Sequence, residues 1–128
     1  MQTNEMIRCR VVACREALDD NQQWSFYLIN DSAASLDSVA LLEIGYEWGD
    51  MGSSEKTDVS VSDLAPGAFV LIWRDDGSGA ELRMDLSLRV RMDGREAQLR
   101  FEFPKLYKLN LPLVDSLGKP GWQTSDEA

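Results

Sequence analysis

The side chains in this sequence that could act as nucleophiles have no histidine to activate them. The 128 residues include serines, threonines and two cysteines but no histidine, the commonest general base near neutral pH. No serine stands in a G-x-S-x-G arrangement, and no glycine-rich phosphate loop is present. The sequence therefore predicts a protein that is not an enzyme.

Two pairs of carboxylates have the residue types for acid–base work on a sugar. On an extended strand Glu43 and Glu47 would lie about 13 Å apart, which is too far for hydrolysis of a glycosidic bond. Asp85 and Glu102 are expected opposite each other in a hairpin, where they would repel unless Arg83 or Arg100 on the diagonal relieves them. We interpret both pairs as parts of a solvated, charged strand face.

No metal site or cofactor is expected. The run from Asp75 to Glu81 begins like a calcium loop, but glycines stand at its third and fifth positions, where ligand oxygens are needed, so it predicts a tight turn. Cys9 and Cys14 fall in one predicted strand, on opposite faces and about 17 Å apart, and cannot form a disulfide with each other. Reduced thiols are typical of cytosolic proteins.

Arginines and tryptophans supply the candidate partner-binding residues. Arg89, Arg91 and Arg95 form a basic patch that could meet an acidic partner or a phosphate, or could be neutralised by carboxylates on a salt-bridged face. Trp48, at the end of its predicted strand, and Trp122, after a Pro-Gly pair, could stack on a sugar or dock on a protein. For Trp122, anchoring the tail on its own domain and docking into a neighbour both stay open.

The charge of the chain bears on its location and partners. A formal net charge of −9 disfavours binding to nucleic acid or anionic membrane through the overall electric field. No apolar run approaches the roughly 20 residues that span a bilayer, and arginines interrupt any leader-like stretch near the N-terminus. We expect a cytoplasmic protein that has no membrane contact.

A long β-hairpin over residues 81–103 is the strongest structural signal. Apolar and polar residues alternate from Leu82 to Met92 and again from Ala97 to Phe103, which predicts two strands with one buried face. Asp93-Gly94 between them is typical of a two-residue type I′ turn. The turn predicts a register that pairs Met92 with Arg95, Val90 with Ala97, Leu88 with Leu99, Leu86 with Phe101 and Met84 with Phe103.

Shorter strands are predicted at residues 6–15, 23–30, 38–48, 57–63 and 69–73, with a Gly/Ser loop at 49–56. In 38–48 apolar residues occur on both faces, with Leu42 and Ile44 on the same one, which predicts a central strand. The pattern predicts an all-β fold, an immunoglobulin-like antiparallel β-sandwich of seven to nine strands. We expect one domain over residues 1–113 and a loosely ordered tail over 114–128.

Three short motifs carry resemblances to known families. Leu64-Ala65-Pro66-Gly67 resembles the sheet-crossing corner of fibronectin type III domains, with Phe69 where a tyrosine usually stands. Tyr27-Leu28-Ile29-Asn30-Asp31-Ser32 and Lys105-Leu106-Tyr107-Lys108-Leu109 resemble segments of an uncharacterised bacterial β-sandwich domain that precedes a small MutS-related (Smr) nuclease domain. This second resemblance implies an accessory interaction domain, and it carries no nuclease residues over to this sequence.

Three functions follow as hypotheses. The first is a non-catalytic module that acts by protein–protein contact, including self-association through the strand edges that a sandwich exposes. The second is a carbohydrate- or calcium-binding module that uses Trp48, Trp122 or the Asp75–Gly79 turn. The third is an accessory domain in nucleic-acid processing that uses the arginines at the hairpin tip.

Overall fold

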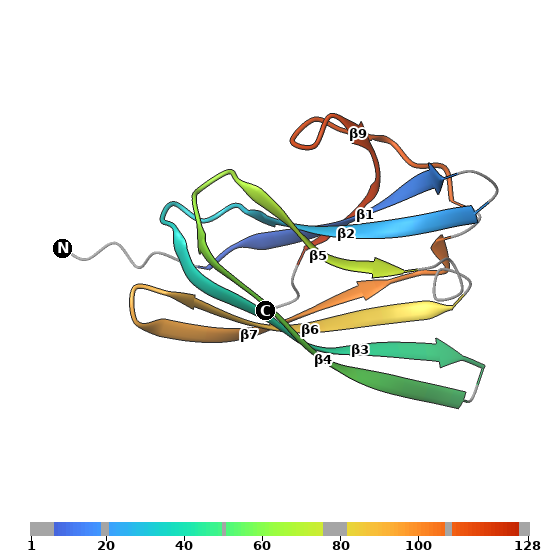
Figure 1. Ribbon diagram of the computed structural model, residues 1–128, viewed down its shortest axis with the longest axis horizontal. Helices are drawn as coiled ribbons and strands as arrows, with labels where there is room; N and C mark the ends of the chain where they lie inside the picture. The colour runs from blue at the N-terminus through green and yellow to red at the C-terminus, as the bar shows by residue number, and fades with distance from the viewer. Residues whose placement is uncertain (1–6, 19–20, 50, 76–81, 107–108, 126–128) are drawn as a thin grey trace.

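The computed structural model describes residues 7–18, 21–49, 51–75, 82–106 and 109–125. Eight strands form two four-stranded antiparallel sheets that lie face to face (Figure 1). Sheet A has the order β10-β1-β2-β5, with β10 at Trp122–Ser125, β1 at Cys9–Leu18, β2 at Asn21–Asn30 and β5 at Phe69–Asp75. Sheet B has the order β4-β3-β6-β7, with β4 at Met51–Leu64, β3 at Leu36–Trp48, β6 at Arg83–Met92 and β7 at Arg95–Phe103. The predicted all-β antiparallel sandwich is confirmed.

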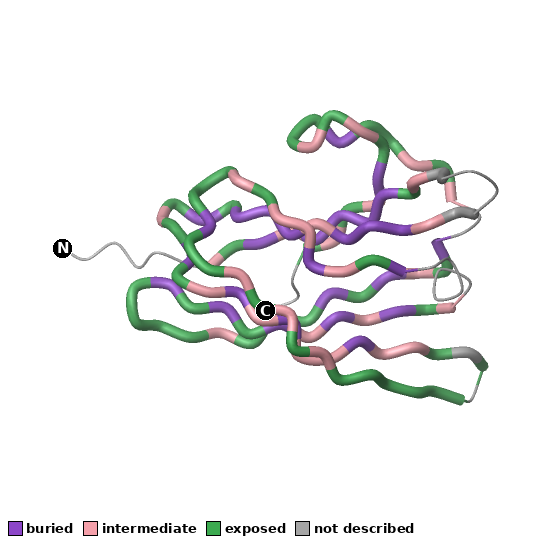
Figure 2. Tube along the Cα trace, viewed as in Figure 1, coloured by how far each residue is buried: buried purple, intermediate pink, exposed green. Residues whose placement is uncertain are grey.

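The core lies between the two sheets and is supplied by alternate residues of the strands. Burial alternates along β6 and β7, as Figure 2 shows. Trp24, Phe26 and Leu28 of β2 are buried opposite this hairpin. The rings of Phe26 and Phe103 meet edge to face, with 5.2 Å between their centroids, so an aromatic pair joins sheet A to sheet B.

The hairpin β6–β7 has the predicted register in all five pairs, from Met92 opposite Arg95 to Met84 opposite Phe103. Asp93 and Gly94 have φ angles of 52° and 75°, as a type I′ turn requires at both of its central positions. Such a turn adds the right-handed twist that the flanking strands need. The sequence pattern of this hairpin was therefore sufficient to place it.

The alternation in β3 changes phase at Leu42. The partners of Leu41 and Glu43 on β6 are consecutive residues, so Leu42 is the extra residue of a β-bulge. Val39 and Leu41 before the bulge and Ile44 after it consequently all face the core. Val39 and Leu41 thus share the face of Ile44, whereas strict alternation puts them on the opposite face, and a bulge rather than burial on both faces produces the pattern.

The predicted loop at 49–56 is wrong. β3 ends at Trp48 and β4 already begins at Met51, which pairs with Trp48, so residues 51–56 are strand. From Met51 to Lys56 the residues of β4 are exposed whichever way their side chains point (Figure 2). This end of the β3–β4 hairpin buries no face against sheet A. The residues of β4 there are therefore mostly small and polar, and they lack the apolar alternation by which a strand is recognised in a sequence.

The C-terminal segment differs from the expected loose tail. Trp122–Ser125 forms β10 and pairs with residues 10–13 of β1, so the last strand lies beside the first. Before it, β8 (Leu113–Val114) and β9 (Lys119–Pro120) make a small ribbon that lies above sheet A in Figure 1. The sequence predicts an edge strand over residues 104–114, interrupted by Pro104 and Pro112, and among its described residues only Leu113–Val114 is strand. β9 and β10 have too few residues for a period to be recognised, so the sequence predicts no structure there.

At the corner that resembles fibronectin type III domains, the chain crosses from β4 to β5. The amide of Ala68 donates to the carbonyl of Ala65 at 3.0 Å, and Gly67 has φ 77°, which together make a type II turn. Phe69 follows on the outer side of sheet A and is 47% exposed, with its ring against that of Tyr27. Because Phe69 has no hydroxyl, the corner needs another polar group to hold it.

Asn30, at the buried end of β2, supplies that group. Its carbonyl accepts from the amide of Gly67 at 2.7 Å, and its Nδ2 donates to the carbonyls of Leu64 and Ala34 at 3.0 and 2.9 Å. Its Oδ1 accepts from the amide of Ser32 at 2.9 Å. A buried amide with each side-chain atom satisfied therefore ties three chain segments together.

Candidate interaction surface

The two outer faces of the sandwich differ in what covers them. On sheet A, Val12, Cys14 and Ile29 form a second apolar cluster with Val114 of the C-terminal ribbon. The backbone at Gly121 lies so close to β1 that a Cβ there would stand 2.5 Å from Cγ1 of Val12 and 3.0 Å from Sγ of Cys14. The outer face of sheet B is a charged surface with grooves. Sheet B is therefore the face on which to look for a partner.

The arginines at the hairpin tip are engaged by a carboxylate. Oε1 of Glu96 lies 3.1 Å from Nε of Arg91 and 3.5 Å from Nε of Arg89. Arg95 is exposed, but it stands opposite the buried Met92 and so has the opposite side-chain direction from the other two. The structure thus brings two of the three predicted arginines together, on a salt-bridged face.

A groove beside the tip adds a further carboxylate. It is lined by Asp37, Ser38, Arg91, Gly94 and Glu96. Oδ2 of Asp37 accepts from the amide of residue 93 at 3.0 Å, which fastens the turn to the start of β3. The positive charge of the arginines is offset by Asp37 and Glu96, so this surface suits a polar protein partner better than a phosphate.

A second, open groove of about 630 Å³ lies at the other end of the same face. Its floor is formed by Gly45, where a Cβ would stand 2.8 Å from Oδ2 of Asp85. The guanidinium of Arg100 lies 3.1 Å from Asp85 and 3.4 Å from Glu102, and the hydrogen bond to Asp85 raises the pKa of Arg100. Of the two arginines that could relieve the Asp85–Glu102 repulsion, Arg83 and Arg100, it is Arg100 that lies beside both carboxylates.

Three of the four tryptophans lie in or against the core, and the side chain of the fourth is outside the described part of the structure. Trp24 is buried, and Trp73 packs against the core. Trp122 stands opposite Ala13 and also packs against the core cluster, so it anchors β10 on its own domain. The side chain of Trp48 lies outside the described residues. Stacking of a sugar on these rings stays a prediction.

The described residues gather no metal ligands. No group of three or more carboxylates or cysteines in the described part is arranged to hold a metal ion. Asp75 is buried at the end of β5, but residues 76–81, which carry the rest of the predicted turn, lie outside the described part. Calcium binding at that turn is therefore untested.

Two serine–lysine spacings, Ser53 to Lys56 and Ser116 to Lys119, match the S-x-x-K arrangement of some serine hydrolases. The hydroxyl of Ser116 accepts from Arg10, whereas Lys119 bonds to Glu16 and Tyr27. On a helix the residues of the first spacing would be neighbours, but Ser53 and Lys56 both lie on β4. Ser53 pairs with Tyr46, whose side chain packs toward the core, whereas Lys56 pairs with Glu43 on the outer face. The two side chains point to opposite faces of the strand, and the spacing forms no nucleophile–base pair.

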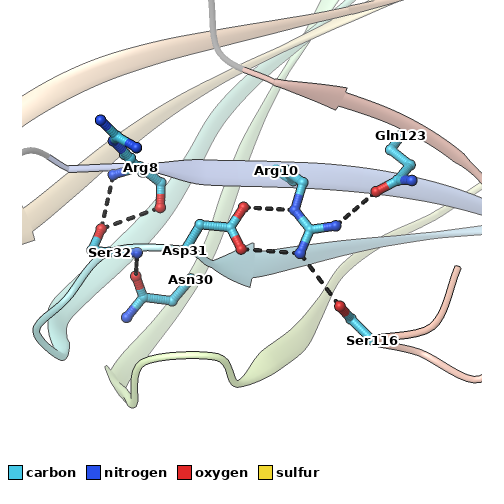
Figure 3. Close-up of polar contacts among 7 residues, drawn as sticks. All are labelled: Arg8, Arg10, Asn30, Asp31, Ser32, Ser116 and Gln123. Carbon is cyan, nitrogen blue, oxygen red and sulfur yellow. Dashed lines mark hydrogen bonds and ion pairs between the residues drawn. The ribbon is translucent and has the colours of Figure 1, made fainter.

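The Asn-Asp-Ser motif at the end of β2 is a structural clasp (Figure 3). The hydroxyl of Ser32 accepts from the amide of Arg8 at 2.8 Å and donates to its carbonyl at 3.1 Å. Asp31 binds Arg10 with both carboxylate oxygens, at 2.6 and 3.0 Å, and Arg10 also reaches Gln123 at 2.7 Å. The motif that resembles the Smr-associated family therefore joins β1, β2 and β10.

A second polar cluster, not predicted from the sequence, holds the C-terminal ribbon to sheet A. Nζ of Lys119 lies 2.9 Å from Oε1 of Glu16 and 2.8 Å from the hydroxyl of Tyr27, and it stands 4.6 Å from the centre of that ring. The hydrogen bond from Lys119 lowers the pKa of Glu16, and the bonds to Tyr27 and Glu16 raise the pKa of Lys119. The partners are over 90 residues apart, so no local spacing could have revealed the cluster.

Comparison with known proteins assigns no family. No protein-family model matches the chain, and no curated protein matches it significantly. Among the described residues there is no helix long and apolar enough to cross a membrane.

Proposed function

We propose that this protein is a non-catalytic interaction module that binds another protein chain through sheet B, along the edge strand β7 and the charged face beside it. The observation that carries the proposal is the state of the β7 edge. β7 has nine residues, pairs with β6 along its whole length without a register shift, and has no other strand beside it in the described part of the sheet. An edge of this kind presents a row of backbone donors and acceptors to another chain.

The other three sheet edges are each blunted. β4 has an irregular register against β3 between Leu41 and Glu43. β5 has a register shift against β2, and β10 is four residues long. Bulges and short strands are devices by which proteins protect an edge from pairing, and β7, which has charged residues but nine residues in unbroken register, has neither of these two.

Further observations agree with this function. The C-terminal ribbon covers the β1–β2 part of the outer face of sheet A, whereas no such ribbon covers the outer face of sheet B in the described part of the chain, and the resemblance to a domain beside Smr nucleases implies an accessory interaction role. We place the protein in the cytoplasm, where the buried Cys9 and Cys14 would stay reduced. The strand orders β1-β2-β5 and β4-β3-β6-β7 support the immunoglobulin-like layout that we propose for the sandwich.

Photo-crosslinking in cells of the source organism tests the proposed function. A photoreactive amino acid at Gln98 or at Arg89 is expected to capture a discrete protein, whether another protein or a second copy of this chain. The same residue at Leu113, which is 64% exposed on the ribbon over sheet A, is the control and should capture none. Equal capture at all three positions, or none at Gln98 and Arg89, would refute the proposal.

A further inference from the structure

The backbone groups that β7 offers to a partner are identified by its turn. In a two-residue hairpin the flanking pair, here Met92 and Arg95, is hydrogen-bonded, and bonded and non-bonded pairs then alternate. Residues 95, 97, 99, 101 and 103 consequently bond to β6, whereas Glu96, Gln98, Arg100 and Glu102 direct their amides and carbonyls away from it. Glu102 lies at the end of β7 that β10 approaches, so the other three are the residues best placed to pair with another strand.

We propose that the occupant of this edge is a second copy of the same chain, in an antiparallel β7–β7 pair with Gln98 at the twofold axis. The proposal deepens the proposed function by naming its partner. With Gln98 opposite Gln98 of the second copy, Glu96 stands opposite Arg100 of the second copy, and the relation is reciprocal. Glu96, Gln98 and Arg100 of the two copies thus face one another, and each pair can exchange both backbone hydrogen bonds.

The side chains favour this register on both faces of the joined sheet. On the outer face it creates two identical pairs of opposite charge, Glu96 with Arg100, around a central pair of amides. On the inner face it sets Ala97 opposite Leu99 of the second copy, and both already pack in or against the core. The pairing would join the two copies of sheet B into one continuous sheet with closed twofold symmetry.

Neighbouring registers are less favourable. Moving the axis to Leu99 places Glu96 opposite Glu102 of the second copy, which sets like charges against each other twice. Moving it to Ala97 leaves Arg100 opposite the turn glycine, Gly94, with no carboxylate to meet. The C-terminal end of β7 is approached by β10, since Thr124 lines a hollow with Glu102 and Phe103, so pairing is expected over the segment nearer the turn.

Changing Gln98 to glutamate tests whether this residue lies at the twofold axis of the β7–β7 pair. Within one copy Gln98→Glu places a carboxylate opposite Arg89, a favourable pair, so the fold should be retained. Across the axis it opposes two carboxylates, and dimerisation measured by sedimentation is expected to weaken about tenfold or more. Ser60→Glu, which adds the same charge on the exposed β4, is the control and should leave dimerisation unchanged.

Disulfide trapping tests the register. Hydrogen-bonded partners have Cα atoms about 5.5 Å apart, within the range of a disulfide, so Gln98→Cys should crosslink to itself under mild oxidation. Glu96→Cys alone should not, because its two copies would be about four residues out of register, but a mixture of Glu96→Cys with Arg100→Cys should. The native cysteines are buried and should not interfere.

A strictly monomeric chain at every attainable concentration would overturn the inference, as would a dimer that is insensitive to Gln98→Glu and gives no crosslink at position 98. Neither result would remove the proposed function if photo-crosslinking captures a different protein at Gln98. Conversely, failure of photo-crosslinking at both sheet B positions would refute both proposals.

Discussion

At the scale of single residues, the polar side chains of this protein act mainly as fasteners between segments that are distant in the sequence. Asn30, Asp31 and Ser32 follow one another, yet they bind the β4–β5 corner, Arg10 and Arg8 respectively. In the sequence these residues mark only the end of a strand, because Asn, Asp and Ser all favour turns. Their long-range partners are set by the way the strands pair, and no local pattern in the sequence indicates them.

The buried amide of Asn30 gives the first prediction. Asn30→Asp keeps the side-chain size but replaces the Nδ2 donor with an oxygen that faces the carbonyls of Leu64 and Ala34. We expect a loss of about 3 kcal/mol in the free energy of unfolding, because a buried donor is lost and a charge is left without a partner. Urea denaturation measures it, and Asn110→Asp, at an exposed position, is the control that should change little.

The Glu16–Lys119 pair predicts a pH dependence of stability. Glu16→Gln removes a carboxylate whose pKa is lowered from 4.5 in the folded protein, so the contribution is present above that value and lost as pH falls through the lowered pKa. Lys119, whose pKa is raised from 10.5, contributes to the stability of the folded protein below pH 10.5. This contribution is lost as pH rises through the raised pKa.

The wild-type protein should therefore exceed Glu16→Gln in stability by about 1 kcal/mol between roughly pH 5 and pH 10, a modest value because both side chains are partly exposed. The difference should shrink at lower pH. Glu55→Gln, at an exposed position of β4, should show no such profile. A difference that stays constant down to pH 2 would contradict the role assigned to the pair.

At the scale of elements, how well a strand could be predicted depended on whether it buries one face without interruption. The β6–β7 hairpin alternates without a bulge and ends in a turn of strong preference, and its pairs follow from the sequence. β3 contains a bulge, which shifts the alternation by one residue, so Val39 and Leu41 lie on the same face as Ile44 although strict alternation separates them. The exposed half of β4 has no alternation at all, because no core lies against it.

The contact between Gly121 and β1 gives a prediction at this scale. Gly121→Ala would place a methyl group 2.5 Å from a side-chain carbon of Val12 and 3.1 Å from the carbonyl of Ala13, and the strand cannot yield as a flexible side chain would. We expect a cost of about 1–3 kcal/mol, measured as a lower urea midpoint. Gly52→Ala, whose new methyl group would meet its nearest neighbour at 3.4 Å, is the matched control and should be close to neutral.

At the scale of the whole molecule, β10 makes the end of the chain part of the domain. Its pairing with β1 and the inward position of Trp122 complete sheet A, whereas the sequence predicted a domain ending at residue 113. The candidate site, too, could be predicted only in part. The arginines of the regular hairpin could be named in advance, but their neutralisation by Glu96 and Asp37 and the free edge of β7 depend on how the strands assemble.

Trp122 distinguishes a structural anchor from a partner-binding residue. Trp122→Ala should lower the free energy of unfolding by about 2 kcal/mol, because a partly buried ring is removed from the core. At temperatures where the variant is folded, it should bind the same photo-crosslinked partner as the wild type. Leu113→Ala, at an exposed apolar position, should leave stability unchanged, and a stable Trp122→Ala that fails to bind would instead favour docking.

Because Cys14 lies beneath the C-terminal ribbon, its rate of alkylation can report local detachment of that ribbon. Cys14 lies on the outer side of β1, under Val114 and Gly121, whereas Cys9 lies between the sheets. Burial raises the pKa of Cys14 to about 11, so the closed form should react slowly with alkylating reagents. Detachment of the ribbon alone would release Cys14, whereas Cys9 requires the sheets to separate. The ratio of the two alkylation rates therefore reports how often the end of the chain lifts from a domain that otherwise stays folded.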